Sequence, residues 1–402
     1  MSDGQRSIVI IGAGQAGGRA AEALRTAQFL GAITVIGGEA HLPYERPQLS
    51  KSMLIEGDAP KFIRSAAEWS EIGVDLHVGA NAVACDSERR IVGLQDGREF
   101  RFDKLLLATG TRPRRLPGLE GGPVPVSYLR DIDDAIALRG VLWKGCRVLL
   151  VGGGVIGLEV AAAAVSRGCS VTVVEAATDV LAQVGSPTVS AFFRRIHSER
   201  GVSFLLGRTV VANVEGGAEL SDGSFCAADL ILIGIGVEPS LELAAAMGLP
   251  SQSGIRVDRA GATDIPNVYA AGDVSLQWSR FTERWMRIEN WANAQDQAAA
   301  VSKSMLGLDQ CYEPTPWFWT DQYDVNLQVV GTLSGVEEIV RGDIAGAKLC
   351  LVGLRDGEVV GGATVNSPKD MAVLRRLVSM RKRPSRGDLE NPAFDLKRAL
   401  AS

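Results

Sequence analysis

Glycines recur at one spacing in two stretches of the chain: Gly12, Gly14 and Gly17 in IIGAGQAGG, and Gly152, Gly154 and Gly157 in LVGGGVIGLE. In such a set the first glycine permits a tight turn, and the second lets the backbone approach a pyrophosphate. The third lets a helix pack closely on the preceding strand. The N–H groups at the start of that helix can then bind phosphate. The pattern therefore favours binding of a dinucleotide at each stretch.

An acidic residue follows each glycine set at the distance where a carboxylate can bind a ribose diol. Glu39 follows the first set, and Glu175 closes the apolar run VTVVE after the second. A carboxylate at Glu175 would repel a 2′-phosphate, and no arginine follows it in EAATD. The second site is therefore expected to prefer NADH to NADPH. Two dinucleotide sites in one chain suggest a tightly held flavin and an exchangeable nicotinamide.

The elements that must position these residues are two strand–helix–strand units. SIVIIGAG, AGGRAAEALRTA and AITVIGGE form the first, and RVLLVGGG, VIGLEVAAAAVSRG and SVTVVEA form the second. Two more apolar runs end in glycine, KLLLATGTRP and DLILIGIGVEP. After about residue 315 we expect an antiparallel sheet, with a hairpin turn at the Asp-Gly pair of GLRDGEVVGG. A helix around DMAVLRRLVSM and a loosely held polar tail complete an α/β fold class.

Composition narrows the functional class. The chain has 402 residues and a net charge of −5, which argues against wholesale nucleic-acid binding. No apolar run has transmembrane length, and MSDGQRSIVIIG leads directly into a strand without a signal-peptide pattern, so we expect a cytoplasmic protein. The cysteines are scattered without a C-x-x-C spacing, and three histidines lack clustered partners. No metal site is predicted.

Eight segments, taken in order, resemble one known family. They are GAGQAGGRAAEALR, LPYERPQLSK, LLLATGTRPR, YLRDIDDA, LLVGGGVIGLEVAAAA, IPNVYAAGDV, RIENWANAQDQA and PWFWTDQYD. Together they look like the oxygenase-coupled NADH–ferredoxin reductases, the type of putidaredoxin reductase and the biphenyl dioxygenase ferredoxin reductase. The resemblance covers about residues 7–335 strongly and the final region more loosely.

The resemblance implies a fold and a domain order. It implies two Rossmann-like dinucleotide-binding domains of the glutathione-reductase-like arrangement and a C-terminal α+β domain. In this arrangement the FAD-binding domain is discontinuous. The expected division is an FAD-binding domain at 1–113, an NAD-binding domain at 114–242, a second part of the FAD-binding domain at 243–316, and a C-terminal domain at 317–402.

The resemblance also carries roles to single positions. Lys51 and Glu159 match a pair beside the flavin N5 and the nicotinamide, and are the catalytic candidates. Asp273 matches an aspartate that binds the ribityl chain, and Trp291 and Trp319 match residues that line the isoalloxazine. The full set of cofactor-binding candidates is Gly12, Gly14, Ala16, Gly17, Glu39, Arg46, Lys51, Val83 through its backbone, Ala108, Thr109, Gly110, Arg130, Gly152, Gly154, Val155, Ile156, Gly157, Glu159, Glu175, Gly236, Gly272, Asp273, Trp291 and Trp319.

The implied activity is FAD-dependent NADH:ferredoxin reduction. Hydride passes from NADH to FAD, and single electrons then pass to a two-iron two-sulfur ferredoxin that serves a cytochrome P450 or a Rieske-type oxygenase. No cysteine pair lies in ERPQLSKSMLIEG to carry electrons through a disulfide. Two alternatives stay open: an NADH oxidase, and a redox-sensing flavoprotein like apoptosis-inducing factor. We expect a monomer without membrane or nucleic-acid partners.

A run of basic residues near the C-terminus is a candidate surface for an acidic ferredoxin. It comprises Arg375, Arg376, Arg381, Lys382, Arg383 and Arg386, with no acid among them. An equally good interpretation is a solvated helix end and tail.

Overall fold

A computed structural model describes residues 6–250 and 252–401 of the chain. The chain divides into two compact units. The first comprises Met1–Pro47, Pro60–Arg112 and Val237–Pro314, and the second comprises Gln48–Ala59, Pro113–Gly236 and Thr315–Ser402. No helix in the described ranges has both the length and the hydropathy that a membrane crossing requires.

The first unit is built on a parallel sheet with the strand order β19-β7-β1-β2-β3. Its strands are β1 (Ser7–Ile11), β2 (Ala32–Ile36), β3 (Val74–His77), β7 (Lys104–Leu107) and β19 (Val268–Ala270). In register, Ile10 lies opposite Val35 on one side and Leu106 on the other. The central strands β1, β2 and β7 are mainly apolar because a parallel sheet is covered on both faces, whereas the edge strand β3 contains Asp75 and His77.

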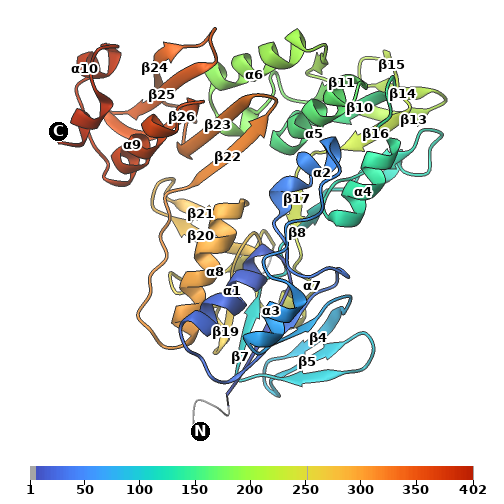
Figure 1. The fold of residues 1–402 in the computed structure, drawn as a ribbon, viewed down its shortest axis with the longest axis vertical. Helices are drawn as coiled ribbons and strands as arrows, with labels where there is room; N and C mark the ends of the chain where they lie inside the picture. The colour runs from blue at the N-terminus through green and yellow to red at the C-terminus, as the bar shows by residue number, and fades with distance from the viewer. Residues whose placement is uncertain (1–5, 251, 402) are drawn as a thin grey trace. The chain divides into compact units, whose positions relative to one another are not determined.

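Alternate residues of β1 enter two different cores. Ile8 and Ile10 pack with residues of α1 (Gln15–Thr26) and α8 (Trp291–Met305), which lie side by side (Figure 1). Val9 and Ile11 pack on the opposite face. Residues of an antiparallel sheet and of one helix cover that face. The sheet consists of β4 (Ala82–Asp86), β5 (Ile91–Leu94) and β6 (Glu99–Arg101), and the helix is α7 (Glu242–Ala246). The other strands and α-helix of this unit are α3 (Ala66–Glu71), β17 (Val237–Pro239), β18 (Ile255–Arg256), β20 (Ser275–Ser279) and β21 (Arg284–Met286). Strand β8 (Thr111–Pro113), at the border of the unit, pairs with β17.

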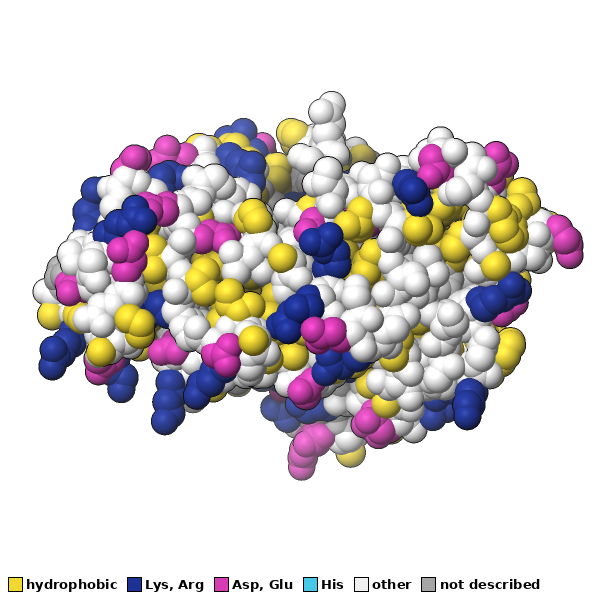
Figure 2. All heavy atoms as spheres, turned by 90° about the horizontal axis from the view of Figure 1, so that it is seen from above, with side chains coloured by type: hydrophobic (Ala, Val, Ile, Leu, Met, Phe, Trp, Pro, Cys, Tyr) yellow, Lys and Arg dark blue, Asp and Glu magenta, His cyan; other side chains and the backbone are white. Residues whose placement is uncertain are grey.

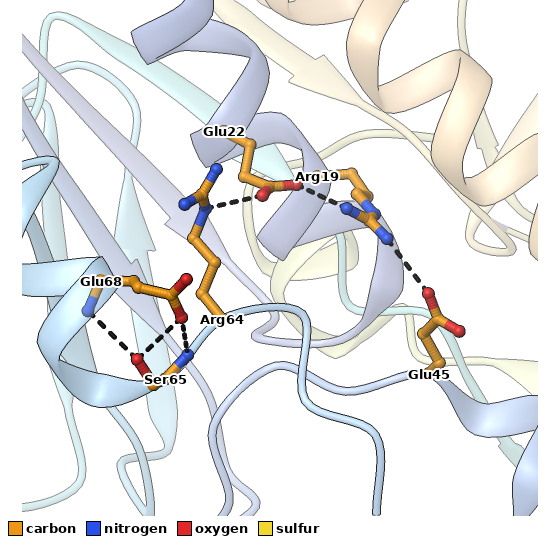
Figure 3. Close-up of polar contacts among 6 residues, drawn as sticks. All are labelled: Arg19, Glu22, Glu45, Arg64, Ser65 and Glu68. Carbon is orange, nitrogen blue, oxygen red and sulfur yellow. Dashed lines mark hydrogen bonds and ion pairs between the residues drawn. The ribbon is translucent and has the colours of Figure 1, made fainter.

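An ion-pair network holds the flanks of segment Gln48–Ala59 to α1. Figure 3 shows Arg19 between Glu22, at 2.7 Å, and Glu45, at 3.2 Å, while Arg64 binds Glu22 at 2.7 Å. The Glu45 backbone N–H donates to the carbonyl of Lys61 at 2.9 Å. The chain therefore leaves the first unit and returns to it through paired backbone segments. The segment between them, which carries Lys51, belongs to the second unit.

The second unit contains another parallel sheet, with the order β12-β11-β10-β16-β9. Its strands are β9 (Val126–Ser127), β10 (Arg147–Val151), β11 (Ser170–Glu175), β12 (Ser203–Leu206) and β16 (Leu230–Ile233). A separate antiparallel sheet joins β13 (Val210–Val214), β14 (Gly217–Leu220) and β15 (Phe225–Ala227). The helices of this part are α2 (Ser52–Ile55), α4 (Ile132–Val141), α5 (Val155–Ser166) and α6 (Pro187–Glu199). Both strand–helix–strand units expected from the sequence are present.

The C-terminal part is an antiparallel sheet with the order β22-β23-β26-β25-β24, and α9 (Pro368–Ser379) packs on it (Figure 1). Its strands are β22 (Trp317–Gln322), β23 (Val325–Gly331), β24 (Glu337–Asp343), β25 (Lys348–Arg355) and β26 (Glu358–Val365). Asp356 and Gly357 turn between β25 and β26 with φ of +50° and +78°, as a tight hairpin requires. The predicted sheet, hairpin and helix are confirmed.

The prediction of a loosely held tail is wrong. The Arg341 guanidinium donates to the carbonyls of Leu389, Asn391 and Phe394, at 3.0 Å and 2.5 Å for the last two. Leu389, in α10 (Arg386–Glu390), is fully buried, and Leu396 is buried in the turn that follows. Because the anchoring arginine lies about 50 residues upstream, the composition of the tail did not reveal this attachment.

One buried histidine joins α6 to β22. His197 Nε2 lies 2.7 Å from Gln322 Oε1, and Nδ1 lies 3.0 Å from the hydroxyl of Tyr323. Burial lowers the pKa of His197 to about 4, because desolvation outweighs the hydrogen bond to Gln322, and the nearby Arg200 also lowers it. The Phe204 ring packs edge-on against the imidazole, with a centroid distance of 6.3 Å. The folded protein therefore holds this histidine neutral.

We predict that His197 makes the protein less stable as the pH falls. The unfolded chain takes up a proton below the ordinary pKa of 6.5, whereas the folded state resists protonation until about 4. Stability should therefore fall across this interval, by about 2 kcal/mol between pH 7 and pH 5. In urea unfolding at both pH values, His197→Gln should show a smaller loss than the unsubstituted protein. Equal losses would contradict this.

Candidate functional site

The first glycine set forms a turn that other residues do not fit. Gly12 has a φ of +113°, and its N–H donates to the carbonyl of Ile36 at 2.7 Å. A Cβ at Gly12 would lie 2.1 Å from Ala108 O, and one at Gly17 would lie 1.8 Å from Gly12 O. Both distances are far below contact distance. Helix α1 therefore meets the turn after β1 backbone to backbone, and that turn meets the segment after β7 in the same way.

The space in front of α1 is different. Gly14 is the residue at its N-cap, and as a glycine it supplies no side-chain cap to this helix end. A Cβ at Gly14 would have Arg46 Nη2, at 3.7 Å, as its close neighbour in the described part of the chain. The Gln15 side chain is 6% exposed, and its amide has no described hydrogen-bond partner. The uncapped N–H groups and this buried amide fit a polar, anionic ligand such as a pyrophosphate. Ala16 follows in the first turn and is buried.

Glu39 and Arg46 form a charged cluster beside this loop. Arg46 Nη2 binds Glu39 Oε1, and the Tyr44 hydroxyl donates to Glu39 Oε2 at 2.6 Å. Burial lowers the pKa of Arg46, but Tyr44, Glu39 and Asp273 raise it by more, so its net pKa lies above the ordinary value. Asp273 is thus close enough to act on Arg46. Both predicted ligands at this end, Glu39 and Asp273, lie in the first unit.

Two loops at the ends of parallel strands lie beside the first glycine set. After β7, the Ala108 N–H donates to Ile11 O at 2.8 Å, and the Thr109 hydroxyl donates to Ser240 O at 2.8 Å. Gly110 accepts from the N–H of Ser240 at 3.0 Å. After β19, Gly272 has a φ of +78°. Its N–H donates at 2.8 Å to the amide oxygen of Gln297, which also accepts from the Ser275 hydroxyl. Gln297 thereby fixes the turn that carries Asp273.

Other candidates are more scattered. Val83 lies in β4 where the register with β5 shifts, and its side chain is exposed. Trp291 begins α8 in the first unit, and Trp319 lies on β22 in the second, stacked on Trp317 at 5.4 Å. The N–H of Arg130 donates to Asp134 at the start of α4.

The second glycine set repeats the first geometry. Gly152 has a φ of +107°, and a Cβ at Gly157 would lie 2.3 Å from Gly152 O. Gly154 is at the N-cap of α5, again without a described side-chain cap. Within the described residues, the near neighbour of a Cβ at Gly154 is the amide nitrogen of Gln183, at 3.5 Å. Val155 and Ile156 start the helix, and Ile156 is exposed. At the end of a neighbouring strand Gly236 accepts from the N–H of Arg114 at 3.0 Å.

Glu175 is held at the tip of β11 beside this loop. Its carboxylate accepts from the N–H of Gly153 at 2.6 Å and from that of Ala177 at 2.8 Å. Arg208, whose N–H donates to the Glu175 carbonyl, directs its guanidinium to Asp222 at 2.8 Å. The nearby arginine is therefore already engaged with a carboxylate, and the carboxylate of Glu175 is fixed beside the second glycine loop.

Lys51 and Glu159 are brought together in the second unit. Lys51 Nζ lies 2.7 Å from Glu159 Oε1, and Glu159, on α5, is 3% exposed. The Ser50 hydroxyl donates to Oε2, and the Thr320 hydroxyl donates to Oε1 at 2.6 Å. The buried carboxylate is thus balanced by an ammonium and by hydroxyl donors, which burial of a charge requires.

Sequence reasoning missed the polar residues that support these candidates. Ser50 precedes Lys51 in RPQLSK, and Thr320 follows Trp319 in PWFWTDQYD. Thr320 and Gln322 alternate along β22, and both are buried. Buried polar residues at a period of two were a signal that could have identified the face of the strand that meets Glu159.

The cysteines and the basic run offer little additional chemistry. All six cysteines lie in the described part of the chain and are free, and Cys311 is exposed. Arg381 and Arg383 bind Glu358, Arg386 binds Glu337 and Glu390, and the Arg375 guanidinium lies 4.7 Å from the Trp317 ring. Figure 2 shows basic and acidic side chains interspersed over the visible face. Much of the basic run is therefore balanced by acids from other segments.

Comparison with protein families matches most of the chain. Residues 6–298 match the family described as pyridine nucleotide-disulphide oxidoreductase, and residues 317–400 match the reductase C-terminal family. The ferredoxin–NAD(+) reductase component of the p-cumate 2,3-dioxygenase system of Pseudomonas putida is 43% identical over 400 residues, 99% of each chain. The corresponding component of the anthranilate 1,2-dioxygenase system of Burkholderia cepacia is 41% identical over 401 residues, 98% of this chain and 99% of the relative.

Solved structures are similar over the same length. The covalent putidaredoxin reductase–putidaredoxin complex aligns with a TM-score of 0.94 at 33% identity, covering 98% of each chain. The ferredoxin reductase for the CYP199A2 system from Rhodopseudomonas palustris aligns with a TM-score of 0.92 at 35% identity, covering 98% of this chain and 100% of that one.

We predict that Lys51 and Glu159 are energetically coupled. Lys51→Met should destabilise the protein because it leaves a buried carboxylate without its cation, and Glu159→Gln should remove most of that penalty. The double variant should therefore be more stable than the sum of the single effects implies, by about 1 kcal/mol or more. Urea unfolding of the variants measures this.

The matched control is Lys61→Met, because the Lys61 side chain is 62% exposed in its ion pair with Glu45. Its effect should be below about 1 kcal/mol. Strict additivity of Lys51→Met and Glu159→Gln would show that the pair is not coupled.

Proposed function

The chain belongs to the pyridine nucleotide-disulphide oxidoreductase family, and we propose that it is the FAD-dependent NADH:ferredoxin reductase of an oxygenase system. The observation that carries the proposal is the presence of two dinucleotide loops in one chain whose cysteines are all free. Relatives over almost the full length are ferredoxin–NAD(+) reductase components of dioxygenase systems.

A bound FAD would supply hydride acceptance from NADH and release of the two electrons one at a time, which suits a one-electron acceptor such as ferredoxin. The residues of the protein would bind the two dinucleotides and orient them. We assign the first loop to the FAD pyrophosphate, because Glu39, Arg46 and Asp273 gather beside it in the same unit. The second loop is assigned to NADH, with the fixed carboxylate of Glu175 available to accept from ribose hydroxyls.

Lys51 and Glu159 are assigned to the nicotinamide end of the NADH site. Glu159 lies in the first turns of α5, the helix that begins at the second glycine loop, so its carboxylate is close to that loop along the chain. Its hydrogen bonds keep Lys51 Nζ at a fixed position. The pair thereby presents a positioned cation to a bound ligand without leaving a net buried charge.

The proposal extends to the partner and to the organisation of the chain. We assign a two-iron two-sulfur ferredoxin as acceptor, with a cytochrome P450 or Rieske-type oxygenase beyond it. We also assign a monomeric, cytoplasmic reductase. The four-part division at 1–113, 114–242, 243–316 and 317–402 belongs to the same proposal. It is supported by one strand–helix–strand unit in the first part and one in the second.

The decisive experiment is reduction of a [2Fe–2S] ferredoxin by the purified, FAD-loaded protein. We expect turnover with NADH, at least tenfold higher in kcat/KM than with NADPH because the Glu175 carboxylate disfavours a 2′-phosphate. Glu175→Ala should narrow that ratio. Rapid consumption of NADH without ferredoxin would indicate an oxidase instead, and equal use of NADPH would contradict the assignment of Glu175.

We predict separate effects for alanine at the two N-cap glycines. Gly14→Ala should weaken FAD binding about tenfold or more, whereas Gly154→Ala should keep FAD and raise KM for NADH by a similar factor. The added methyl group fits the fold in each case but occupies the phosphate approach. Flavin absorbance per protein and steady-state kinetics separate these outcomes.

Gly140→Ala is the control, since no described atom beyond its chain neighbours and the backbone of its own helix lies within 4 Å of the new methyl group. It should affect neither measurement. If Gly14→Ala changed KM for NADH and Gly154→Ala released FAD, the assignment of the loops would be reversed.

A further inference from the structure

A continuous chain of hydrogen bonds runs from Glu159 into the interior of the second unit. The Thr320 hydroxyl contacts Glu159 Oε1 at 2.6 Å, and Gln322 Nε2 contacts Thr320 Oγ1 at 3.1 Å. Gln322 Oε1 lies 2.7 Å from His197 Nε2, and His197 Nδ1 lies 3.0 Å from the Tyr323 hydroxyl. The residues come from α5, α6, β22 and the turn that follows β22, and the two helices are remote from the strand in sequence (Figure 1).

The series of hydrogen bonds is buried from Glu159 to His197, and its end at Tyr323 is partly exposed. Relative exposure is 3% for Glu159, 0% for Thr320, 1% for Gln322 and 0% for His197. Water therefore cannot replace a lost partner cheaply, and an unsatisfied group here costs the free energy of its desolvation. Each of these four buried residues must therefore find its hydrogen-bond partners within the protein.

The charge of Glu159 sets the direction of every bond. An ionised carboxylate accepts only, so the Thr320 hydroxyl must donate to it. Thr320 Oγ1 then accepts from the amide nitrogen of Gln322, which turns the amide oxygen of Gln322 toward His197. That oxygen needs a donor, so His197 carries its proton on Nε2, and Nδ1 accepts from Tyr323.

The opposite direction is incompatible with the short contact at Glu159. If His197 carried its proton on Nδ1, the Gln322 amide would flip and accept the Thr320 hydroxyl. A lone pair of Thr320 would then face the carboxylate at 2.6 Å. The two arrangements are mutually exclusive, because reversing one hydrogen bond exchanges donor and acceptor at the other bonds of the series.

We propose that His197 is a positioning residue for Glu159. Its Nε2–H fixes the amide of Gln322, which fixes the hydroxyl of Thr320 as a donor to the carboxylate that holds Lys51. The pKa of His197, lowered to about 4 by burial, keeps the imidazole neutral, as the arrangement requires. The tautomer of His197 therefore depends on the charge of Glu159. The kinetic consequence rests on the proposed function, whereas the tautomer does not.

The direct test is nitrogen-15 NMR of histidine side chains in the FAD-loaded protein. The chain has three histidines, and the His197 signal is identified by its loss in His197→Gln. We expect a neutral Nε2–H tautomer that does not titrate between about pH 7 and pH 5. An Nδ1–H tautomer, or a signal that titrates in this range, would overturn the proposal.

The coupling is tested by breaking the chain at Thr320. Thr320→Val should release the tautomer of His197, which appears as a change in both ring nitrogen shifts. Thr364→Val is the matched control, because Thr364 is also fully buried in this sheet and its hydroxyl has no described partner. An unchanged His197 signal in Thr320→Val, or an equal change in both variants, would refute the coupling.

The kinetic test compares His197→Leu with His197→Gln. The rate of flavin reduction by saturating NADH should fall about tenfold in the leucine variant, because loss of the bond to Gln322 weakens the Thr320 hydrogen bond to the charged carboxylate of Glu159. Glutamine can place an N–H where Nε2 was and should recover the rate to within about threefold. Equal rates in the two variants would leave His197 without a positioning role. Failure of the unsubstituted protein to reduce ferredoxin would instead refute the proposed function.

Discussion

Backbone contact between glycines is the constraint on which the rest of the structure depends. A methyl group at Gly17 would come within 1.8 Å of the Gly12 carbonyl, and one at Gly157 within 2.3 Å of the Gly152 carbonyl. This close approach packs α1 and α5 directly against their strands. It leaves the first N–H groups of each helix without a described side-chain cap. Two anion-binding helix ends are thereby fixed in one chain. The proposed ligand contacts of the surrounding charged residues depend on the positions of these helix ends.

The charged residues around the two loops are handled in different ways. Near the first loop, Arg46 forms an ion pair with the partly exposed Glu39, and the charge of Asp273 also raises the pKa of Arg46. Near the second, Glu159 is buried, and an ammonium and hydroxyl groups satisfy it. A buried carboxylate tolerates little rearrangement, since each lost donor is costly. The second arrangement is therefore the more rigid, which suits a pair that must hold its geometry while an exchangeable ligand enters and leaves.

Segment Gln48–Ala59 illustrates how the chain assembles this pair. It follows the first glycine unit in sequence and its flanks are fixed to α1 by ion pairs, yet the segment itself belongs to the second unit (Figure 3). Because this segment packs with the second unit, Lys51 lies within ion-pair distance of Glu159. The C-terminal sheet contributes Thr320 to the same carboxylate. Contributions from three distant parts of the sequence meet on one side chain, so its environment depends on the fold as a whole.

Local spacing determined the two dinucleotide loops, the strands and helices that carry them, and the acids Glu39 and Glu175, because these features depend on residues within about 25 positions of each other. The Asp-Gly hairpin was determined in the same way, through the φ values that its two residues tolerate. The roles of Lys51, Glu159 and Asp273 came from resemblance to a family. Only the tertiary structure revealed that Ser50, Thr320, Gln322 and His197 support Glu159, and that Arg341 holds the tail. Apart from the bond between Gln322 and Thr320 within β22, these contacts join residues that are about 50 to 160 positions apart. Their geometry depends on how sheets and helices pack, which no local pattern encodes.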